Sequence, residues 1–303
     1  MRSNIHHMSK AIVTLATGDY KELWEVYARP TWQAFCDRQG YELVAFHEPL
    51  DTCARAAGRS MAWQKLICHE HPRLQGFQHL IWLDADIVIN PDAPDPLLEA
   101  DPEKIGACLE FDWGRDPQLA PISQVWLGQQ RCKFEEQHPG KRFEGYPKLW
   151  GFGEGAGPLI NTGFLLFSPQ RHGALLRHVY DNYDDSEVMH WGEMVPLSEE
   201  IHRADMFHAM DQRFNMLIVP FLASLLSGSE QSKMRILATA SMIYRLLNDN
   251  YFLHFAGFKF LGLRYMTGAS WDGDNGFQPN LSAILATIKA NLEANGLTML
   301  DDL

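Results

Sequence analysis

The sequence predicts an α/β fold built on a doubly wound, mostly parallel sheet flanked by helices, with a helical C-terminal part. In the first hundred or so residues, short apolar runs alternate with longer segments of helical periodicity. Such alternation is typical of parallel sheets with helices on both faces. The chain has 303 residues, of which 46% are hydrophobic, so one large domain or two closely packed ones can bury a sizeable core.

The first half of the chain is expected to alternate between strands and helices. The expected strands span 11–18 (AIVTLATG), 41–46 (YELVAF), 80–90 (LIWLDADIVIN) and 103–111 (EKIGACLEF). The expected helices span 20–40 (YKELWEVYARPTWQAFCDRQG) and 58–71 (GRSMAWQKLICHEH). Pro30 predicts a kink or break in the first helix, and Gly40 is expected to end it. Ligands of doubly wound sheets bind outside the carboxyl ends of the strands, so a site is expected there.

The second half is expected to begin with a strand and then to become mainly helical. The expected elements are a strand at 158–167 (PLINTGFLLF) and helices at 168–183, within 220–248 and at 280–296. We expect residues 1–265 to form one domain and residues 266–303 to pack on it as a helical tail. Residues 112–158 are rich in Trp, Gly and Pro. A loop region of this length is usually functional, so we expect it to bind an acceptor or to act as a lid.

Composition excludes several classes of protein. The net charge of −12 and the pI of about 5.5 argue against a nucleic-acid partner. The five cysteines are scattered without a C-x-x-C pair, so we expect neither disulfides nor a zinc site, and a cytoplasmic protein with reduced thiols. The apolar stretch near the N-terminus is too short for a signal peptide, and no segment has the length of a transmembrane span. The oligomeric state has no signature in the sequence.

Asp84 and Asp86 interrupt a segment that otherwise has the pattern of a buried strand, LIWLDADIVIN. Side chains at i and i+2 of a strand share a face, with α-carbons roughly 6.6 Å apart. Two unpaired carboxylates at that spacing repel each other, and a divalent cation would remove the repulsion. Oxygen ligands suit the hard ions manganese and magnesium. The alternative is a strand that has ended, with the two carboxylates capping the next turn.

Five motifs occur in a specific order between about residue 11 and about residue 260: ATGDY, LIWLDADIVIN, LINTGFLLF, AMDQRFN and LHFAGFK. This order resembles that of GT-A glycosyltransferases with a DxD motif. It is most similar to glycosyltransferase families 8 and 34, the retaining glycogenin-like and α-galactosyl/xylosyl enzymes. The resemblance implies metal-dependent transfer of a hexose, galactose or glucose first, from a UDP-sugar to a glycan or another hydroxyl acceptor.

The resemblance also implies a metal site. Asp84 and Asp86 match the DxD pair that holds manganese against the donor diphosphate, and His254 matches the third protein ligand. An imidazole suits a transition metal better than magnesium, so this set favours Mn²⁺, with Mg²⁺ as the alternative. Taken alone, His254 between two apolar residues would more often be an ordinary core histidine.

Donor-binding residues follow from the same resemblance. Tyr20 matches an aromatic residue that stacks on uracil, although Tyr20 could also be an ordinary turn residue before a helix. Arg59 and Lys65 resemble basic residues that reach the donor, or are solvated surface charges. Asn161 and Gly163 match an N-x-G motif that contacts and accommodates the donor sugar. The further donor-binding residues implied are Thr17, Asp19, Asp84, Ala85, Gly257 and Lys259.

Two adjacent residues are the implied catalytic pair. Asp211 would accept hydrogen bonds from hydroxyls of the donor sugar, and the amide oxygen of Gln212 would face the anomeric carbon. An amide is a poor nucleophile, so the resemblance implies front-face attack through an oxocarbenium-like ion pair. Adjacent residues cannot point the same way in regular structure, so the two side chains are expected to have different tasks. Asp184 and Glu193 have no assigned role.

Two alternatives remain open at this point. LDADIV also fits the opening motif of haloacid-dehalogenase-type phosphatases, in which Asp84 would be the nucleophile. Those enzymes usually carry the motif on their first strand and need a paired-Asp metal site, which Asp184 and Asp185 could supply. The other alternative is a protein that binds nucleotide sugars without turnover.

Overall fold

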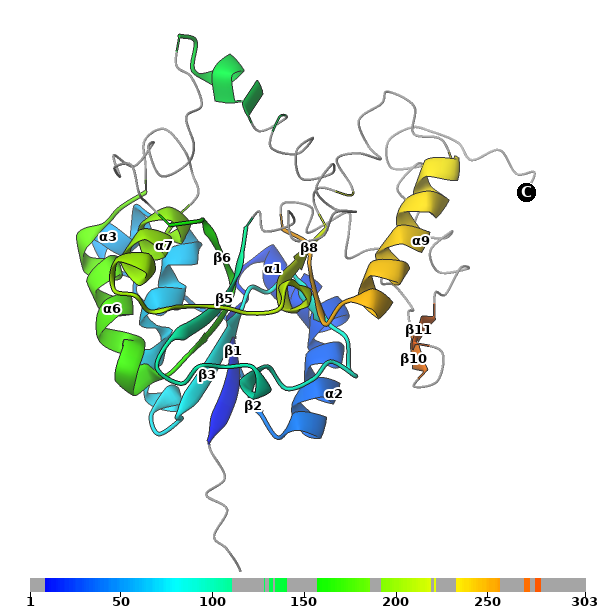
Figure 1. The fold of residues 1–303 in the computed structure, drawn as a ribbon, viewed down its shortest axis with the longest axis horizontal. Coiled ribbons are helices and arrows are strands. Elements are labelled where there is room, and N and C mark those ends of the chain that lie inside the picture. Colours follow the sequence, from blue (N-terminus) through cyan, green and yellow to red (C-terminus); the bar gives the residue numbers. More distant parts are fainter. Residues whose placement is uncertain are drawn as a thin grey trace, which may run out of the picture.

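A six-stranded mixed sheet forms the centre of the computed structural model (Figure 1), with strand order β2-β1-β3-β6-β5-β7. The structure describes residues 9–110, 128, 131–132, 134–140, 157–185, 192–218, 221, 233–256, 270–272 and 276–278. The pairs β1–β2, β1–β3 and β5–β7 are parallel, whereas β6 is antiparallel to both of its neighbours. The strands are β1 Lys10–Leu15, β2 Glu42–Phe46, β3 His79–Leu83, β5 Ile105–Leu109, β6 Ile160–Phe167 and β7 Phe207–Ala209.

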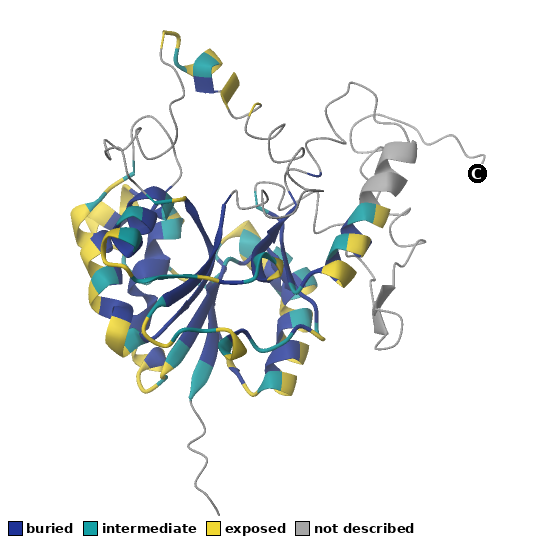
Figure 2. Cartoon of the chain, in the orientation of Figure 1, coloured by how far each residue is buried: buried dark blue, intermediate teal, exposed yellow. Residues whose placement is uncertain are grey.

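Helices cover both faces of the sheet, as the alternating pattern of the sequence predicts. Figure 1 shows α6 and α7 on one side and α1 and α2 on the other. Ala11 and Val13 of β1 pack on the α6 side, and Ile12 between them packs on the α2 side, so one strand supplies both cores. The helices are α1 Asp19–Leu23, α2 Arg29–Gln39, α3 Ala54–Ala57, α6 Pro169–Asn182, α7 Met194–Arg203 and α9 Lys233–Asp249. Figure 2 shows that the strands are buried and that the exposed residues lie on the outer sides of the helices.

A second, three-stranded sheet adjoins the α2 side, with the order β4-β9-β8. Its strands are β4 Ile87–Ile89, β8 Met216–Leu217 and β9 Phe252–His254. His254 lies opposite Ile87 in one pairing and opposite Leu217 in the other. The expected strand 80–90 is therefore two strands, β3 and β4, in different sheets. The turn between them holds Asp84 and Asp86. Because β4 pairs with β9, His254 of β9 lies beside Asp86, which follows β3.

Several helices differ in detail from the prediction. The segment expected as one helix consists of α1, a π-helical turn at Trp24–Ala28 and α2. Pro30 therefore stands in the first turn of α2, where it does not interrupt the helix. Gly40 ends α2 in the left-handed conformation, as predicted. The segment expected as a helix at 58–71 is a 3-10 helix at Met61–Glu70. Shorter 3-10 turns lie at Pro72–Leu74, Pro96–Leu98 and Gln212–Asn215.

The C-terminal part is helical at α9. Within the expected tail 266–303, the described residues form a hairpin of β10 Ser270–Asp272 and β11 Gly276–Gln278, and the helix expected at 280–296 lies outside the described residues. Most of the region 112–158 also lies outside them. All five cysteines are free. Among the described residues, no helix has the length and apolar character that crossing a membrane requires.

Candidate metal and nucleotide site

Asp84, Asp86 and His254 converge at the carboxyl end of β3. One ligand atom from each of them lies within 4.8 Å of the others. β3 ends at Leu83, the backbone N–H of Asp84 donates to Gly163 O, and the N–H of Ile87 closes the turn on Asp84 O. The strand has therefore ended, as the alternative interpretation held, yet the turn still directs both carboxylates toward one small volume.

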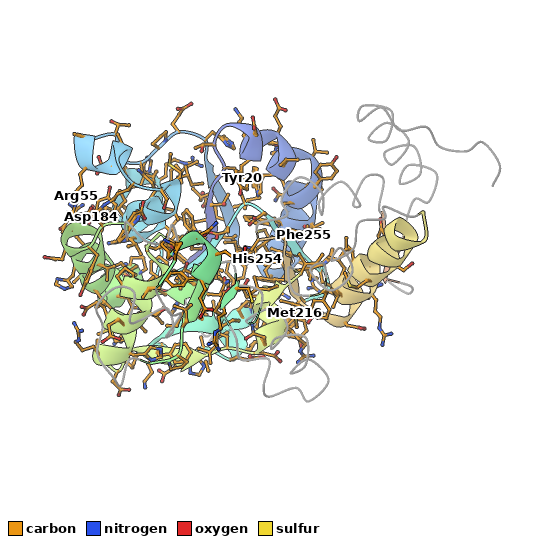
Figure 3. The ribbon with its side chains drawn as sticks, turned by 90° about the horizontal axis from the view of Figure 1, so that it is seen from above. Tyr20, Arg55, Asp184, Met216, His254 and Phe255 are labelled. Carbon is orange, nitrogen blue, oxygen red and sulfur yellow. The ribbon has the colours of Figure 1, made fainter. Side chains whose placement is uncertain are left out.

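His254 is held against this turn by its neighbours. The N–H of Phe255 donates to Asp86 O at 2.9 Å, and His254 Nε2 lies 3.2 Å from Asp86 Oδ1. Figure 3 shows His254 near the middle of the molecule, with Phe255 beside it. Burial lowers the pKa of His254, but Asp86 and then Asp84 raise it, and the net direction is upward. The cluster therefore attracts a cation, which can be the proton on His254 or a metal ion.

Gly163 makes room for the His254 ring. A Cβ at position 163 would lie 2.3 Å from His254 Cε1 and 2.7 Å from its Nδ1, far inside van der Waals contact. The resemblance implies that this glycine accommodates the donor sugar. In the structure, it leaves space for the His254 ring. Its predicted contact with the sugar stays a prediction.

A chain of buried polar side chains supports His254 from behind. Asn161 Oδ1 accepts from the Gly163 N–H at 2.9 Å and from Asn215 Nδ2 at 2.7 Å, and Asn161 Nδ2 donates to Glu110. Asn215 Oδ1 lies 2.9 Å from His254 Nδ1. The Asn161 amide, predicted to meet the donor sugar, is thus bonded within the protein. Burial raises the pKa of Glu110 to about 7, although the hydrogen bond from Asn161 lowers it.

Lys65 lies on the other side of Asp84. Its ammonium lies 3.1 Å from Asp84 Oδ1 and 2.8 Å from Glu193 Oε1, and it donates to Thr162 O. Burial lowers the pKa of Lys65, but the two carboxylates outweigh burial and hold it above the ordinary value. Lys65 was expected to reach the donor or to be a solvated charge. It is a buried cation that orients Asp84, not a solvated charge, and it gives Glu193 a structural role. Its predicted contact with the donor stays a prediction.

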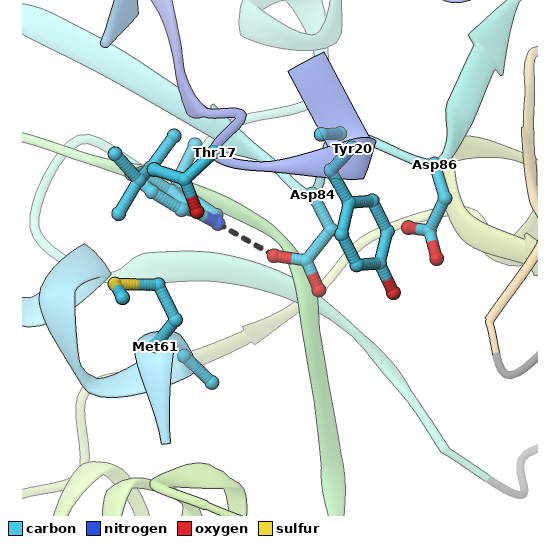
Figure 4. Close-up of a pocket in the computed structure, with 9 residues that line it drawn as sticks. Thr17, Tyr20, Met61, Asp84 and Asp86 are labelled. Atoms are coloured by element: carbon cyan, nitrogen blue, oxygen red, sulfur yellow. Dashed lines mark hydrogen bonds between the residues drawn. The ribbon is translucent and has the colours of Figure 1, made fainter. Parts of the chain in front are cut away.

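An open pocket lies against the aspartates (Figure 4). Trp82 Nε1 donates to Asp84 Oδ1, the same oxygen that Lys65 contacts, which leaves Oδ2 for a further ligand. Tyr20 stands over the carboxylates at the start of α1, and burial, then Asp86 and Asp84, raise the pKa of its hydroxyl. Asp19 lies in the first turn of α1 and does not line the pocket. The lining residues are Leu15, Thr17, Tyr20, Met61, Ala62, Trp82, Asp84, Ala85 and Asp86.

Arg59 does not line this pocket. Its guanidinium donates to Asp184 and to the backbone oxygens of Tyr180 and Tyr183, and it lies 4.5 Å from the Trp63 ring. It is buried, so it is not a solvated charge, and its donors connect the 3-10 helix at Met61–Glu70 to the end of α6. Arg59 is thus a structural anchor and not a surface charge, and its predicted contact with the donor stays a prediction.

Asp211 and Gln212 point to different partners, as expected for adjacent residues. Asp211 caps the short 3-10 turn, accepting from the backbone N–H and the guanidinium of Arg213. Gln212 Nε2 donates to Leu109 O at 3.0 Å, and no described residue bonds its Oε1. The same turn carries Asn215, which contacts His254, so this turn adjoins the cluster of Asp84, Asp86 and His254. Gly257 and Lys259 lie outside the described residues.

Sequence reasoning missed Glu110, Thr162 and Asn215. Glu110 directly follows the apolar strand β5, and Asn215 stands between two buried apolar residues. Each is a polar residue in or beside an apolar run, the anomaly that singled out the two aspartates. That signal marks them as unusual but cannot name their partners, since Asn161 is 51 residues from Glu110 and 54 from Asn215.

An α/β fold with an Asp–Asp–His cluster at the end of a central strand defines a candidate metal and nucleotide site. No family model and no curated protein matches the chain. Among solved structures, a glycosyltransferase involved in glycosylation of the major capsid of PBCV-1 is similar, with a TM-score of 0.51 and 15% identity over 85% of this chain and 98% of that chain. LgtC, a galactosyltransferase in complex with donor and acceptor sugar analogs, and an active-site mutant of LgtC each have a TM-score of 0.44 and 14% identity, over 96% of this chain and 98% of theirs. At such identity the first likeness shows the fold, and the predicted GT-A type of α/β fold is confirmed.

Proposed function

We propose that the protein is a metal-dependent, retaining glycosyltransferase that moves a hexose from a UDP-sugar to a hydroxyl of a glycan or similar acceptor. The observation that carries the proposal is the meeting of Asp84, Asp86 and His254 beside a pocket that also contains Tyr20. A fold shared with a glycosyltransferase makes this chemistry the natural one to test.

The donor set fits a divalent transition metal. Two carboxylates and one imidazole are ligands that Mn²⁺ accepts, and the imidazole disfavours Mg²⁺ by comparison. Asp84 already lies beside one cation, Lys65, whereas the charge of Asp86 is left to His254 or a metal. A bound metal would supply neutralisation of the donor diphosphate. Side chains of the protein would hold the uracil base and orient the sugar.

Tyr20 is the candidate platform for the uracil base. Its ring borders the open pocket at the carboxyl end of β1, where doubly wound sheets bind ligands. Stacking of a base on an aromatic ring is worth about 1–3 kcal/mol. We expect Tyr20→Ala to weaken UDP binding by that amount and Tyr20→Phe to preserve it, as measured by calorimetry. Equal UDP affinity of Tyr20→Ala and the wild type would make Tyr20 only a turn residue.

Gln212 is the candidate group for the anomeric carbon, and Asp211 for the sugar hydroxyls. The bond from Gln212 Nε2 to Leu109 O orients the amide, which would leave its oxygen for the substrate. A dipole that acts mainly on developing charge changes kcat more than KM. We expect Gln212→Ala to lose roughly 10²–10³-fold in kcat, by analogy with single oxyanion-hole donors. A Gln212→Ala enzyme with near-normal kcat would refute this role.

The phosphatase alternative is disfavoured by where the second aspartate pair lies. Asp184 is bonded to Arg55 and Arg59, and Figure 3 shows Asp184 with Arg55 at one edge of the molecule, apart from Tyr20 and His254. Asp185 accepts from Ser60 N and Trp63 Nε1. The motif also follows the third strand of the chain, not the first. Hydrolysis of p-nitrophenyl phosphate would favour this alternative.

The test of the proposed function is slow hydrolysis of a panel of UDP-sugars, which identifies the donor without knowledge of the acceptor. We expect turnover with Mn²⁺, none in EDTA, UDP-galactose or UDP-glucose as the best donor, and a sugar first released as the α anomer in a proton NMR time course. Asp86→Asn should abolish turnover. The matched control is Asp37→Asn on the exposed face of α2, which should not change it. Release of the β anomer first would refute retention, and nucleotide-sugar binding without turnover, in hydrolysis or with any acceptor, would favour a binding protein.

A further inference from the structure

His254 has one defined polar neighbour at each ring nitrogen. Nδ1 lies 2.9 Å from Asn215 Oδ1, and Nε2 lies 3.2 Å from Asp86 Oδ1. His254 and Asn215 are both buried, at 3% and 0% exposure, so solvent cannot substitute for either neighbour. The nitrogen that carries the proton decides which nitrogen can bind a metal, because a ligand nitrogen must offer its lone pair.

The direction of each hydrogen bond in this network follows from one backbone group. The Gly163 N–H can only donate, so the atom of Asn161 that it meets at 2.9 Å is the amide oxygen. The group of Asn215 that faces the same oxygen at 2.7 Å must then be its NH₂. The other end of the Asn215 amide, which faces His254, is therefore the carbonyl oxygen.

An amide oxygen accepts but cannot donate, so His254 Nδ1 must carry a proton. In the neutral imidazole the lone pair is then on Nε2, directed at a carboxylate oxygen of Asp86. Two acceptors that face each other in a buried site need a cation between them. The Asn161–Asn215 pair thus determines where that cation is bound.

We propose that Asn215 is a positioning residue that holds the proton of His254 on Nδ1, so that Nε2 is presented to a divalent metal beside Asp86. The inference rests on the metal site of the proposed function and adds a residue to it. Groups that orient a ligating histidine in this way typically affect metal affinity by about 10–100-fold.

The first measurement is calorimetry of Mn²⁺ alone, without nucleotide. We expect Asn215→Ala to bind Mn²⁺ about 10–100-fold more weakly than the wild type. Asn215→Asp keeps an acceptor for the Nδ1 proton but loses the NH₂ that donates to Asn161 Oδ1, so it should bind Mn²⁺ more tightly than Asn215→Ala does. The matched control is Asn250→Ala, which removes another buried amide, bonded to Leu246 O and not to His254. It should bind Mn²⁺ as the wild type does.

The second measurement is NMR of ¹⁵N-histidine-labelled protein loaded with ¹¹³Cd²⁺ as a diamagnetic probe. We expect coupling of the metal to His254 Nε2 and a proton on Nδ1 in the wild type, with the Nδ1 proton signal weakened by exchange in Asn215→Ala. Metal coupling to Nδ1, or equal Mn²⁺ affinities of the wild type and Asn215→Ala, would overturn the role of Asn215 and leave the metal site standing. Absence of Mn²⁺ binding by the wild type would overturn the metal site itself.

Discussion

Replacing Gly163 by alanine tests whether the close approach of β6 to His254 builds the proposed metal site. The added Cβ would lie 2.3 Å from His254 Cε1 and 2.9 Å from Asn161 Oδ1. Carbon atoms in favourable contact are about 3.5–4.0 Å apart, so the ring would have to move by more than about 1 Å. The strand cannot give way easily, because the Gly163 N–H is bonded to Asn161 and its carbonyl accepts from Asp84 N.

We therefore expect two effects of Gly163→Ala. Overpacking of a buried site typically costs about 1–3 kcal/mol, which urea unfolding of the metal-free protein would measure. Displacement of His254 should weaken Mn²⁺ binding by at least about 10–100-fold, as measured by calorimetry. The control is Gly58→Ala, whose Cβ would come no nearer than 3.6 Å to another atom, a backbone oxygen of Arg55. It should change neither quantity appreciably.

The outcome also separates two roles for this glycine. If Gly163→Ala binds Mn²⁺ normally and is as stable as the wild type, the argument from the close contact is wrong. If only the KM for the donor rises, the glycine makes room for the sugar, as the resemblance to the glycosyltransferases implies.

Two other buried charges give predictions that urea unfolding can check. Lys65→Met leaves Asp84 and Glu193 without their cation at a site where the lysine side chain is 2% exposed, so we expect a loss of about 3–5 kcal/mol, partly recovered with Mn²⁺; a loss below about 1 kcal/mol would contradict the ion-pair account. Glu110 has its pKa raised from 4.5 to about 7 in the folded state, so its contribution to stability is present below pH 4.5 and is lost as the pH rises from 4.5 to 7. Glu110→Gln should therefore gain about 2–3 kcal/mol relative to the wild type between pH 5 and pH 8, and a constant difference between the two proteins would show that Glu110 ionises normally.

The predictable parts of this molecule are those that local pattern determines. The apolar runs located β1, β2, β3, β5 and β6, and the alternation with helices indicated a sheet covered on both faces. The reversed direction of β6 was not predictable, because periodicity carries no strand direction and most of the long segment before β6 has no clear pattern.

The residues of the site also include some that the sequence could predict and some that it could not. Asp84 and Asp86 are neighbours in sequence, so their convergence could be inferred, whereas the positions of Lys65 and Arg59 depend on helix packing. Lys65 reaches Thr162, 97 residues away, and Arg59 reaches Asp184, 125 residues away. A basic residue before the DxD strand suggested donor contact. Only the tertiary structure could show that both cations have acidic partners within the protein.

Calorimetry of UDP binding with and without Mn²⁺ tests the central claim most directly, because it asks whether Asp84, Asp86 and His254 hold a cation for the donor diphosphate. At an effective dielectric constant near 20, each pair of like charges about 4 Å apart costs roughly 4 kcal/mol, so a diphosphate should bind these carboxylates very weakly without a metal. We predict measurable UDP affinity in Mn²⁺ and a loss of at least about 100-fold in EDTA, as even one such unrelieved charge pair would cause. Asp86→Asn should bind UDP more weakly than the wild type when Mn²⁺ is present. Equal UDP affinity in Mn²⁺ and in EDTA would contradict the account.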